Sequence, residues 1–234
     1  MLKKSFGNIF GNKNHFQKPK WPETPTRRVV NLSLESTYLL QTENVKKPHS
    51  SCNTTSFGMG LDITKWDESF NISSKTRLPD YLTSFFESDL AFRMRKTLVG
   101  ETSIPPQQLH AVLEWGVNYL CGSEVVSFST NWPQERILKN LDKGLPVVLS
   151  GQFPFKNRHG QWTTIGHIVI LVGYIWEKDK PLQYIIDDPY GDYHTGYRDR
   201  NGNDVLMSQE DFDTIIRTGD RGGKWGHLFL SKKS

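Results

Sequence analysis

The sequence of 234 residues contains two cysteines, and one of them lies where a thiol would be a good nucleophile. Cys52 stands in PHSSCNTTSFGMGLD, between a polar loop and the first residues of an expected helix. The amino end of a helix lowers the pKa of a thiol, and its free N–H groups can bind the oxyanion of a tetrahedral intermediate. An inert structural cysteine is the competing interpretation, and this segment alone leaves both open. Cys121, in NYLCGSE at the end of an apolar helix, is better explained as a packed structural thiol.

Two of the seven histidines follow a glycine at the expected start of a strand, His167 in GHIVIL and His227 in GHLFL. That position would leave an imidazole at the rim of a sheet, where it could act as a general base. No acidic residue follows His227. After His167 the chain runs along one strand, turns near residues 178–181 and returns along QYIIDD. An antiparallel return would bring Asp187 and Asp188 beside His167, so His167 is the better candidate.

The choice between the two aspartates depends on the alternation of side chains along the returning strand. Period-two alternation puts Tyr184 and Asp188 on one face and Asp187 on the other. Pro189 restricts the backbone of Asp188 to extended conformations, which fixes the direction of its side chain. We therefore expect Asp188 to orient His167. For both aspartates the alternative is a pair of solvated turn residues before Pro-Tyr-Gly.

The elements that must position these residues divide the chain into a helical half and a β-rich half. Apolar spacing predicts helices over residues 53–66, 79–94, 106–120 and 133–143. Strands are expected over 146–153, 167–176, 183–187 and 225–230, with a short helix over 208–218 that Ser208 begins. The run HIVILVGYIW is apolar on both faces, as in a central strand. Helices followed by an antiparallel sheet predict an α+β fold.

Four segments of the sequence together resemble a known family. CNTTSFGM, the pair PVVLSGQF and GHIVILVGY, and IIDDPYGD are similar to the bacteriocin-processing-peptidase-like branch of the papain superfamily, which includes phage cell-wall-degrading enzymes; the likeness covers roughly residues 35–192. It implies a papain-like cysteine peptidase fold, with N-terminal helices packed on an antiparallel sheet. It also implies Cys52 as nucleophile, His167 as base and Asp188 as third member of a triad. Gln41, in LLQTEN, would be the side-chain donor of the oxyanion hole.

The positive charge of the sequence belongs to one end of the chain. The net charge is +4, but residues 1–28 hold seven Lys and Arg against one acid, which leaves 22 basic and 24 acidic residues in the rest. We expect residues 1–28 to be a flexible basic leader and residues 29–234 to form one peptidase domain. The leader could adhere to an acidic polymer, or simply be solvated. The body has no basic stripe with interleaved aromatics, so no specific nucleic-acid partner is expected.

Other classes of site and location receive little support from the sequence. It has no CxxC pair and no HExxH, and the resemblance requires neither a metal nor an organic cofactor. The longest apolar run, residues 168–172, is too short for a membrane span, and the first residues lack the apolar stretch of a secretion signal. We expect cytoplasmic synthesis without a signal peptide, and action either from a phage virion or after release on host lysis.

These features predict a cysteine peptidase that hydrolyses amide bonds through a Cys-His-Asp triad. A phage-type peptidoglycan endopeptidase, with a wall peptide as its substrate, fits the resemblance. One alternative is a protease acting on a protein or a leader peptide. Another is a binding or structural protein that retains the fold without catalysis.

Overall fold

The computed structural model describes residues 26–35, 37–70 and 72–231. Most of the expected leader, residues 1–25, lies outside the described residues. Strand β1 (Arg27–Asn31) includes residues 27 and 28 of that segment, so these two residues are part of the sheet. The reason is local pairing: Arg28 lies opposite Trp176 of strand β4 (Trp162–Glu177), and its guanidinium forms an ion pair with Asp142 at 2.7 Å.

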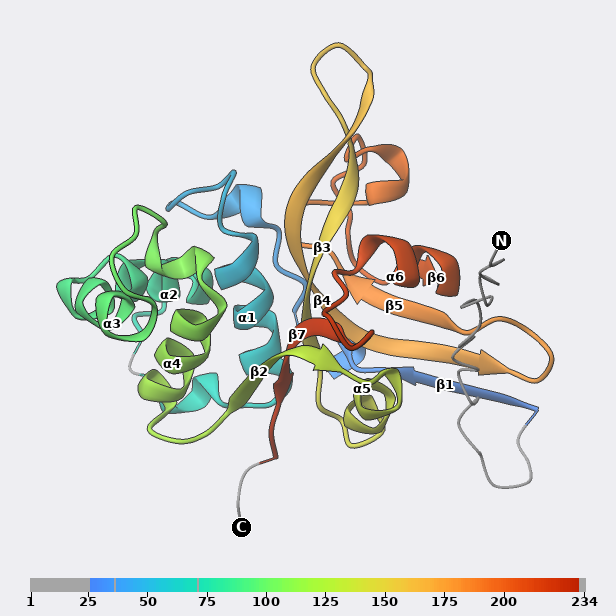
Figure 1. The fold of residues 1–234 in the computed structure, drawn as a ribbon, viewed down its shortest axis with the longest axis horizontal. Helices are drawn as coiled ribbons and strands as arrows, with labels where there is room; N and C mark the ends of the chain where they lie inside the picture. Colours follow the sequence, from blue (N-terminus) through green and yellow to red (C-terminus); the bar gives the residue numbers. More distant parts are fainter. Residues whose placement is uncertain (1–25, 36, 71, 232–234) are drawn as a thin grey trace, which may run out of the picture.

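Four helices form the left half of the molecule in Figure 1, and α1 is the one next to the sheet. They are α1 (Cys52–Ile63), α2 (Leu78–Phe86), α3 (Asp89–Val99) and α4 (His110–Cys121). The prediction of a single helix over 79–94 is therefore wrong, because the helix is interrupted between α2 and α3. Ser88 caps the new helix there, its hydroxyl accepting the N–H of Ala91 at 3.3 Å. In the described part of the chain, no helix is long and apolar enough to cross a membrane.

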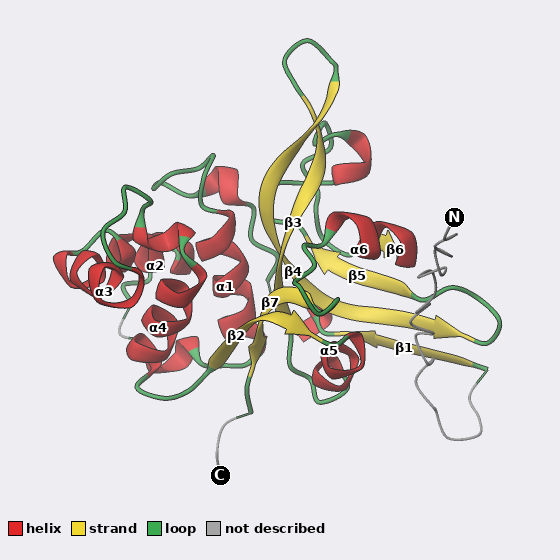
Figure 2. Ribbon diagram, in the orientation of Figure 1, coloured by secondary structure: helices red, strands yellow, loops and turns green. Residues whose placement is uncertain are grey.

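Within the described residues the strands form one seven-stranded sheet, in which every pairing is antiparallel (Figure 2). The strand order is β2-β7-β3-β4-β5-β6, and β1 pairs with the carboxyl-terminal end of β4. The remaining strands are β2 (Val126–Trp132), β3 (Val147–Lys156), β5 (Gln183–Asp187), β6 (Val205–Ser208) and β7 (Lys224–Phe229). The α+β class and the antiparallel sheet agree with the prediction; β2 and β6 were not expected.

Helices cover both faces of the sheet, and the apolar residues of β4 divide between them. Ile170 and Val172 belong to the core under α1–α4. Val169 and Leu171 belong to the core on the opposite face, under α5 (Gln134–Leu141) and α6 (Gln209–Ile215). The central position expected for this strand is confirmed. The helix expected over 133–143 exists as α5, but it packs on the face opposite the other early helices.

The β3–β4 hairpin is longer than the sequence suggested, and this changes the setting of His167. Strand β4 begins at Trp162, five residues earlier than expected, and His167 pairs with Gly151 of β3 inside the hairpin. The hairpin projects beyond the neighbouring strands (Figure 1). The expected position of His167 at the first residue of a strand is therefore wrong. His227 likewise lies inside β7, fully buried.

Candidate active site

The thiol of Cys52 lies at the amino end of α1, facing the sheet. Cys52 is the first residue of the helix, one residue before the start expected from the sequence, and it is half-buried. Its side chain is hydrogen bonded to His167 and to the backbone of Ile168, both on β4. The first turn of a helix has N–H groups without intrahelical partners, so the backbone around Cys52 can also receive negative charge. Cys121 is a second free thiol at the carboxyl end of α4.

The imidazole of His167 lies between Cys52 and Asp188. Its Nε2 is 2.7 Å from Oδ1 of Asp188, which leaves Nδ1 to exchange a proton with the thiol. The side chain is 4% exposed. Phe153 and Tyr197 contact it edge-on at centroid distances of 5.3 and 5.8 Å. These rings restrict its rotation, so the imidazole is held in the orientation that joins the thiol to the carboxylate.

The carboxylate of Asp188 is fully buried and accepts hydrogen bonds from three directions. Oδ1 accepts from His167 and from the N–H of Tyr190 at 2.9 Å. Oδ2 accepts from the hydroxyl of Tyr197 at 3.1 Å. Together these hydrogen bonds fix the orientation of the Asp188 carboxylate beside the imidazole.

Asp187, the other aspartate considered from the sequence, points away from His167. Its Oδ1 accepts the N–H of Asp204 at 2.9 Å, and Oδ2 has no hydrogen-bond partner among the described residues. Burial, with a smaller contribution from the charge of Asp204, raises the pKa of Asp187 to about 7. The structure therefore brings His167 together with Asp188 and not with Asp187.

The electrostatics of the site favour a thiolate–imidazolium pair. Burial alone would raise the pKa of Cys52, but the hydrogen bond and positive charge of His167, with two backbone hydrogen bonds, lower it below its usual value. Burial alone would lower the pKa of His167. The charge and hydrogen bond of Asp188, together with Cys52, outweigh that effect and raise the pKa of His167 to about 10. A thiolate beside a protonated imidazole is the reactive state of a nucleophilic cysteine.

Gln41 lies on the same groove as Cys52, in a 3₁₀ turn (Gln41–Glu43) ahead of the helix. Its side chain is almost fully buried, and Nε2 donates to the carbonyl of Pro48 at 3.2 Å. Its backbone N–H donates to the carbonyl of Pro189 at 2.7 Å. An amide nitrogen has two hydrogens, so Nε2 retains one donor for a second acceptor in the groove.

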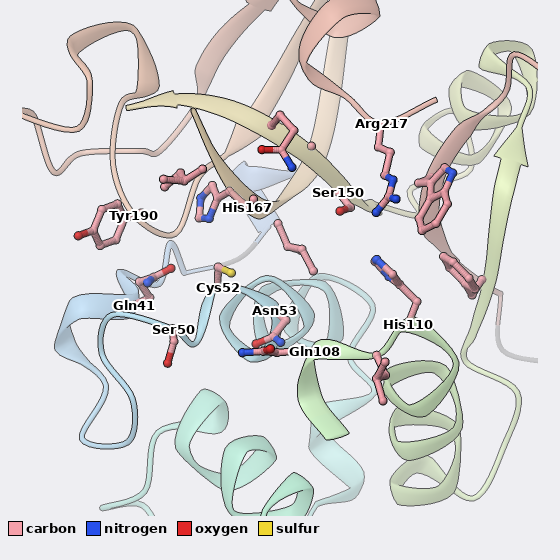
Figure 3. A pocket seen from close by; sticks show the side chains of 18 of the residues that line it. Gln41, Ser50, Cys52, Asn53, Gln108, His110, Ser150, His167, Tyr190 and Arg217 are labelled. Atoms are coloured by element: carbon pink, nitrogen blue, oxygen red, sulfur yellow. The ribbon is translucent and has the colours of Figure 1, made fainter. Parts of the chain in front are cut away.

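The groove that contains these residues has a volume of about 790 Å³ and continues well past the thiol. Figure 3 shows Gln41 and Tyr190 at one end, Cys52 and His167 between, and His110 and Arg217 at the other end. Such a volume suits a ligand of several residues. Sequence reasoning missed His110 and Arg217, since they come from α4 and from the segment after α6, with no spacing pattern to connect them. Among the described residues, no three metal-ligating side chains gather at one place.

Comparison with known proteins agrees with the class of enzyme that this fold and site define, a papain-like cysteine peptidase. Residues 33–212 match the sequence model of the Peptidase_C39 like family, and the chain belongs to that family. A crystal structure described as that of a candidate C39-like peptidase from Bacillus anthracis has the same fold, with a TM-score of 0.53 and 15% sequence identity. The match covers 88% of this chain and all of that one. No curated protein matches the sequence significantly.

Proposed function

We propose that the protein is a peptidoglycan endopeptidase of phage type, in which Cys52, His167 and Asp188 form the catalytic triad. One observation carries the catalytic part of this proposal: the hydrogen-bonded chain from the Cys52 thiol through His167 to the buried carboxylate of Asp188. Family membership supports a cysteine peptidase, and the position of the triad in the middle of a long groove suits a peptide bound in extended form.

The mechanism uses each residue in a separate role. The thiolate of Cys52 attacks the amide carbonyl, and the electron pair of the C=O bond moves to oxygen. The resulting oxyanion accepts hydrogen bonds from the backbone N–H of Cys52 and from Nε2 of Gln41. Protonated His167 gives its Nδ1 proton to the departing amine, the C–N bond breaks, and a thioester remains. His167 then deprotonates a water molecule, which hydrolyses the thioester and regenerates the thiol. Asp188 keeps the imidazole in place throughout.

The proposed substrate follows from the resemblance of the motif segments to phage cell-wall enzymes. A wall peptide is a short, flexible chain of amide bonds with free carboxylates, and it can enter an open groove without a binding partner. Action from a virion, or after host lysis, would bring such an enzyme to the wall. A protease that cuts a protein or a leader peptide would use the same triad, so the substrate must be tested directly.

The test is product analysis on purified peptidoglycan of several wall chemotypes, with denatured casein as the protein substrate. We expect new free amino groups and no new reducing sugar ends from the wall, and no such release by Cys52→Ala. Cleavage of casein with every wall preparation left intact would replace the endopeptidase by a general protease. Absence of hydrolysis from both substrates, with Cys52 unreactive, would support a non-catalytic protein.

A further inference from the structure

One end of the groove contains a positively charged side chain, that of Arg217, which the proposed mechanism does not use. Arg217 lies on the segment between α6 and β7, and its backbone is held from two sides. Its N–H donates to the carbonyl of Ser150 on β3, and its carbonyl accepts the N–H of Trp225 on β7, both at 2.9 Å. Ser150 and Trp225 line the groove together with Arg217. The position of this arginine is therefore fixed by two strands of the sheet.

The guanidinium of Arg217 is ordered by an aromatic ring. Its central carbon lies 3.7 Å from the centroid of the Trp225 ring, a close cation–π contact. Figure 3 shows the side chain extending into the groove, with His110 and Ser150 nearby. Among the described residues, no carboxylate lies within 4 Å of the guanidinium and none of its N–H groups has a hydrogen-bond acceptor. Arg217 thus presents its hydrogen-bond donors to the groove without a partner in the protein.

The charge of Arg217 is not balanced by the rest of the lining. Among the described residues that line the groove, none is aspartate or glutamate. His110 faces the same end, and its Nδ1 is 3.0 Å from Nε2 of the buried His227. Burial, together with the charge of Arg217, lowers the pKa of His110 to about 4, so this histidine is neutral at pH 7. This end of the groove therefore presents one permanent positive charge over apolar aromatic walls, which include Phe128 stacked on His110.

We propose that Arg217, held against Trp225, forms a subsite that binds a carboxylate of the peptide substrate. A guanidinium supplies two parallel N–H donors that match the two oxygens of a carboxylate. The subsite lies at the end of the groove away from Gln41, so the carboxylate belongs to a residue separated from the scissile amide along the peptide. An acidic peptide is then preferred over its neutral amide analogue. The inference rests on the proposed function, because it assumes that Cys52 is the reacting atom of the groove.

A series of alkylating reagents tests the subsite without knowledge of the natural substrate. Each reagent is a bromoacetyl amide of a linear ω-amino acid with one to six methylene groups, compared with the matching primary amide. The thiolate of Cys52 displaces bromide and forms a thioether, while the carboxylate extends into the groove. The rate constants are measured on the full chain by mass spectrometry of the modified peptides, and Cys121 serves as the internal reference thiol.

The result expected for the wild-type protein is a maximum in the acid-to-amide rate ratio at Cys52. At the chain length that reaches Arg217, this ratio should exceed that of the shortest pair by about 5- to 10-fold, as a charge-assisted hydrogen bond would produce. Arg217→Gln should remove the maximum, and Arg217→Lys should retain part of it. Arg221→Gln is the matched control, because Arg221 is exposed, lies outside the groove lining and loses the same charge.

The possible outcomes separate this inference from the proposed function. An acid-to-amide rate ratio that does not vary with the length of the reagent would overturn the carboxylate subsite. A ratio that varies equally in the wild type and in Arg217→Gln would also overturn it. Rapid alkylation of Cys52 in that same experiment would leave the cysteine nucleophile intact. If Cys52 reacts no faster than Cys121 with any reagent, the nucleophile and the subsite are both wrong.

Discussion

The backbone N–H of Gln41 donates to the carbonyl of Pro189, so the turn ahead of the nucleophile is joined to the residue after Asp188. The hydroxyl of Tyr38 strengthens this junction by donating to the carbonyl of Asp188 at 2.7 Å. The amide proposed for the oxyanion hole and the acid proposed for the triad thus share one support. These two hydrogen bonds hold the segment that carries Gln41 against the segment that carries Asp188.

The role of Gln41 predicts a loss in the chemical step rather than in binding. Gln41→Ala should lower kcat by about 100-fold, the usual effect of removing one oxyanion donor, with little change in KM. Gln108→Ala is the matched control, because Gln108 is an exposed glutamine on the same groove, and it should change kcat by less than about 3-fold. Equal losses in the two variants, both folded, would remove Gln41 from the mechanism.

Substituting the histidines of the two glycine-histidine strands should affect different properties, catalysis for His167 and stability for His227. His167→Ala should lower kcat by about 1,000-fold or more, because the thiol loses its proton acceptor. His227 is buried against Phe57 at a centroid distance of 4.9 Å and hydrogen bonded to His110, so His227→Ala should instead reduce the free energy of unfolding by about 2–4 kcal/mol. Urea unfolding and steady-state kinetics on both variants make the comparison. A loss of kcat in folded His227→Ala equal to that of His167→Ala would contradict it.

Asp188→Asn should act on the pH profile as well as on the rate. The amide keeps an acceptor for His167 but loses the negative charge that raises the pKa of the imidazole. Turnover requires a thiolate and a protonated imidazole, so it rises as pH passes the pKa of Cys52 and falls as pH rises through that of His167, about 10. In Asp188→Asn, kcat should fall about 10-fold or more and the alkaline limb should move to lower pH. An unchanged limb would exclude Asp188 as the partner of His167.

Asp187→Asn serves as the neighbouring control, and it should change stability instead. Burial raises the pKa of Asp187 from 3.8 to about 7 in the folded state. Between these values the native protein binds a proton that the unfolded chain has lost, so this contribution to stability is complete below about pH 4 and disappears as pH rises through about 7. The neutral amide avoids that loss. At pH 8 the variant should be more stable than the wild type by about 1–3 kcal/mol in urea unfolding, with near-normal kcat. A kcat loss greater than that of Asp188→Asn would transfer the triad role to Asp187.

The basic residues before β1 should affect adhesion to the wall rather than cleavage. Residues 1–25 contain five lysines and one glutamate, a balance of +4. Removing them leaves β1 complete and should weaken sedimentation with purified walls at low salt, but not hydrolysis of soluble muropeptides. The difference in sedimentation between the full and the truncated protein should vanish above about 0.3 M NaCl, since charge attraction is screened over about 10 Å already at 0.1 M. Slower cleavage of soluble muropeptides by the truncated protein would assign these residues a role at the active site.

The parts of the fold that the sequence predicted are those with strong local signals. Strand β5 agrees with the prediction at both ends, because turn residues bound its apolar run. Helix α6 begins after Ser208, whose hydroxyl accepts the N–H of Asp211 at 3.0 Å, as its capping pattern indicated. By contrast, β2 is a half-buried strand rich in serine and polar residues, and β6 is too short, at four residues, to show a strand pattern.

The proximity of His167 and Asp188 was predictable because these two members of the site lie at adjacent strands. The antiparallel return of β5 along β4 sets Asp187 opposite Ile170, and this register brings Asp188 toward His167. The distant end of the groove has no such link, because His110 and Arg217 belong to elements whose packing depends on long-range contacts. The break between α2 and α3 was missed because apolar spacing continues across Ser88, whose extended backbone (ψ 155°) and capping hydrogen bond interrupt the helix.

The most direct test of Cys52 as the nucleophile is the pH dependence of thiol alkylation by iodoacetamide, followed together with hydrolysis. We predict that Cys52 reacts well below the pH of an ordinary thiol, whose pKa is about 8.5, because His167 stabilises its thiolate. One equivalent of label on Cys52 should abolish hydrolysis, and Cys121→Ser should retain both the labelling and the activity. Labelling that maps to Cys121 first, or hydrolysis that persists after Cys52 is fully alkylated, would show that Cys52 is not the nucleophile.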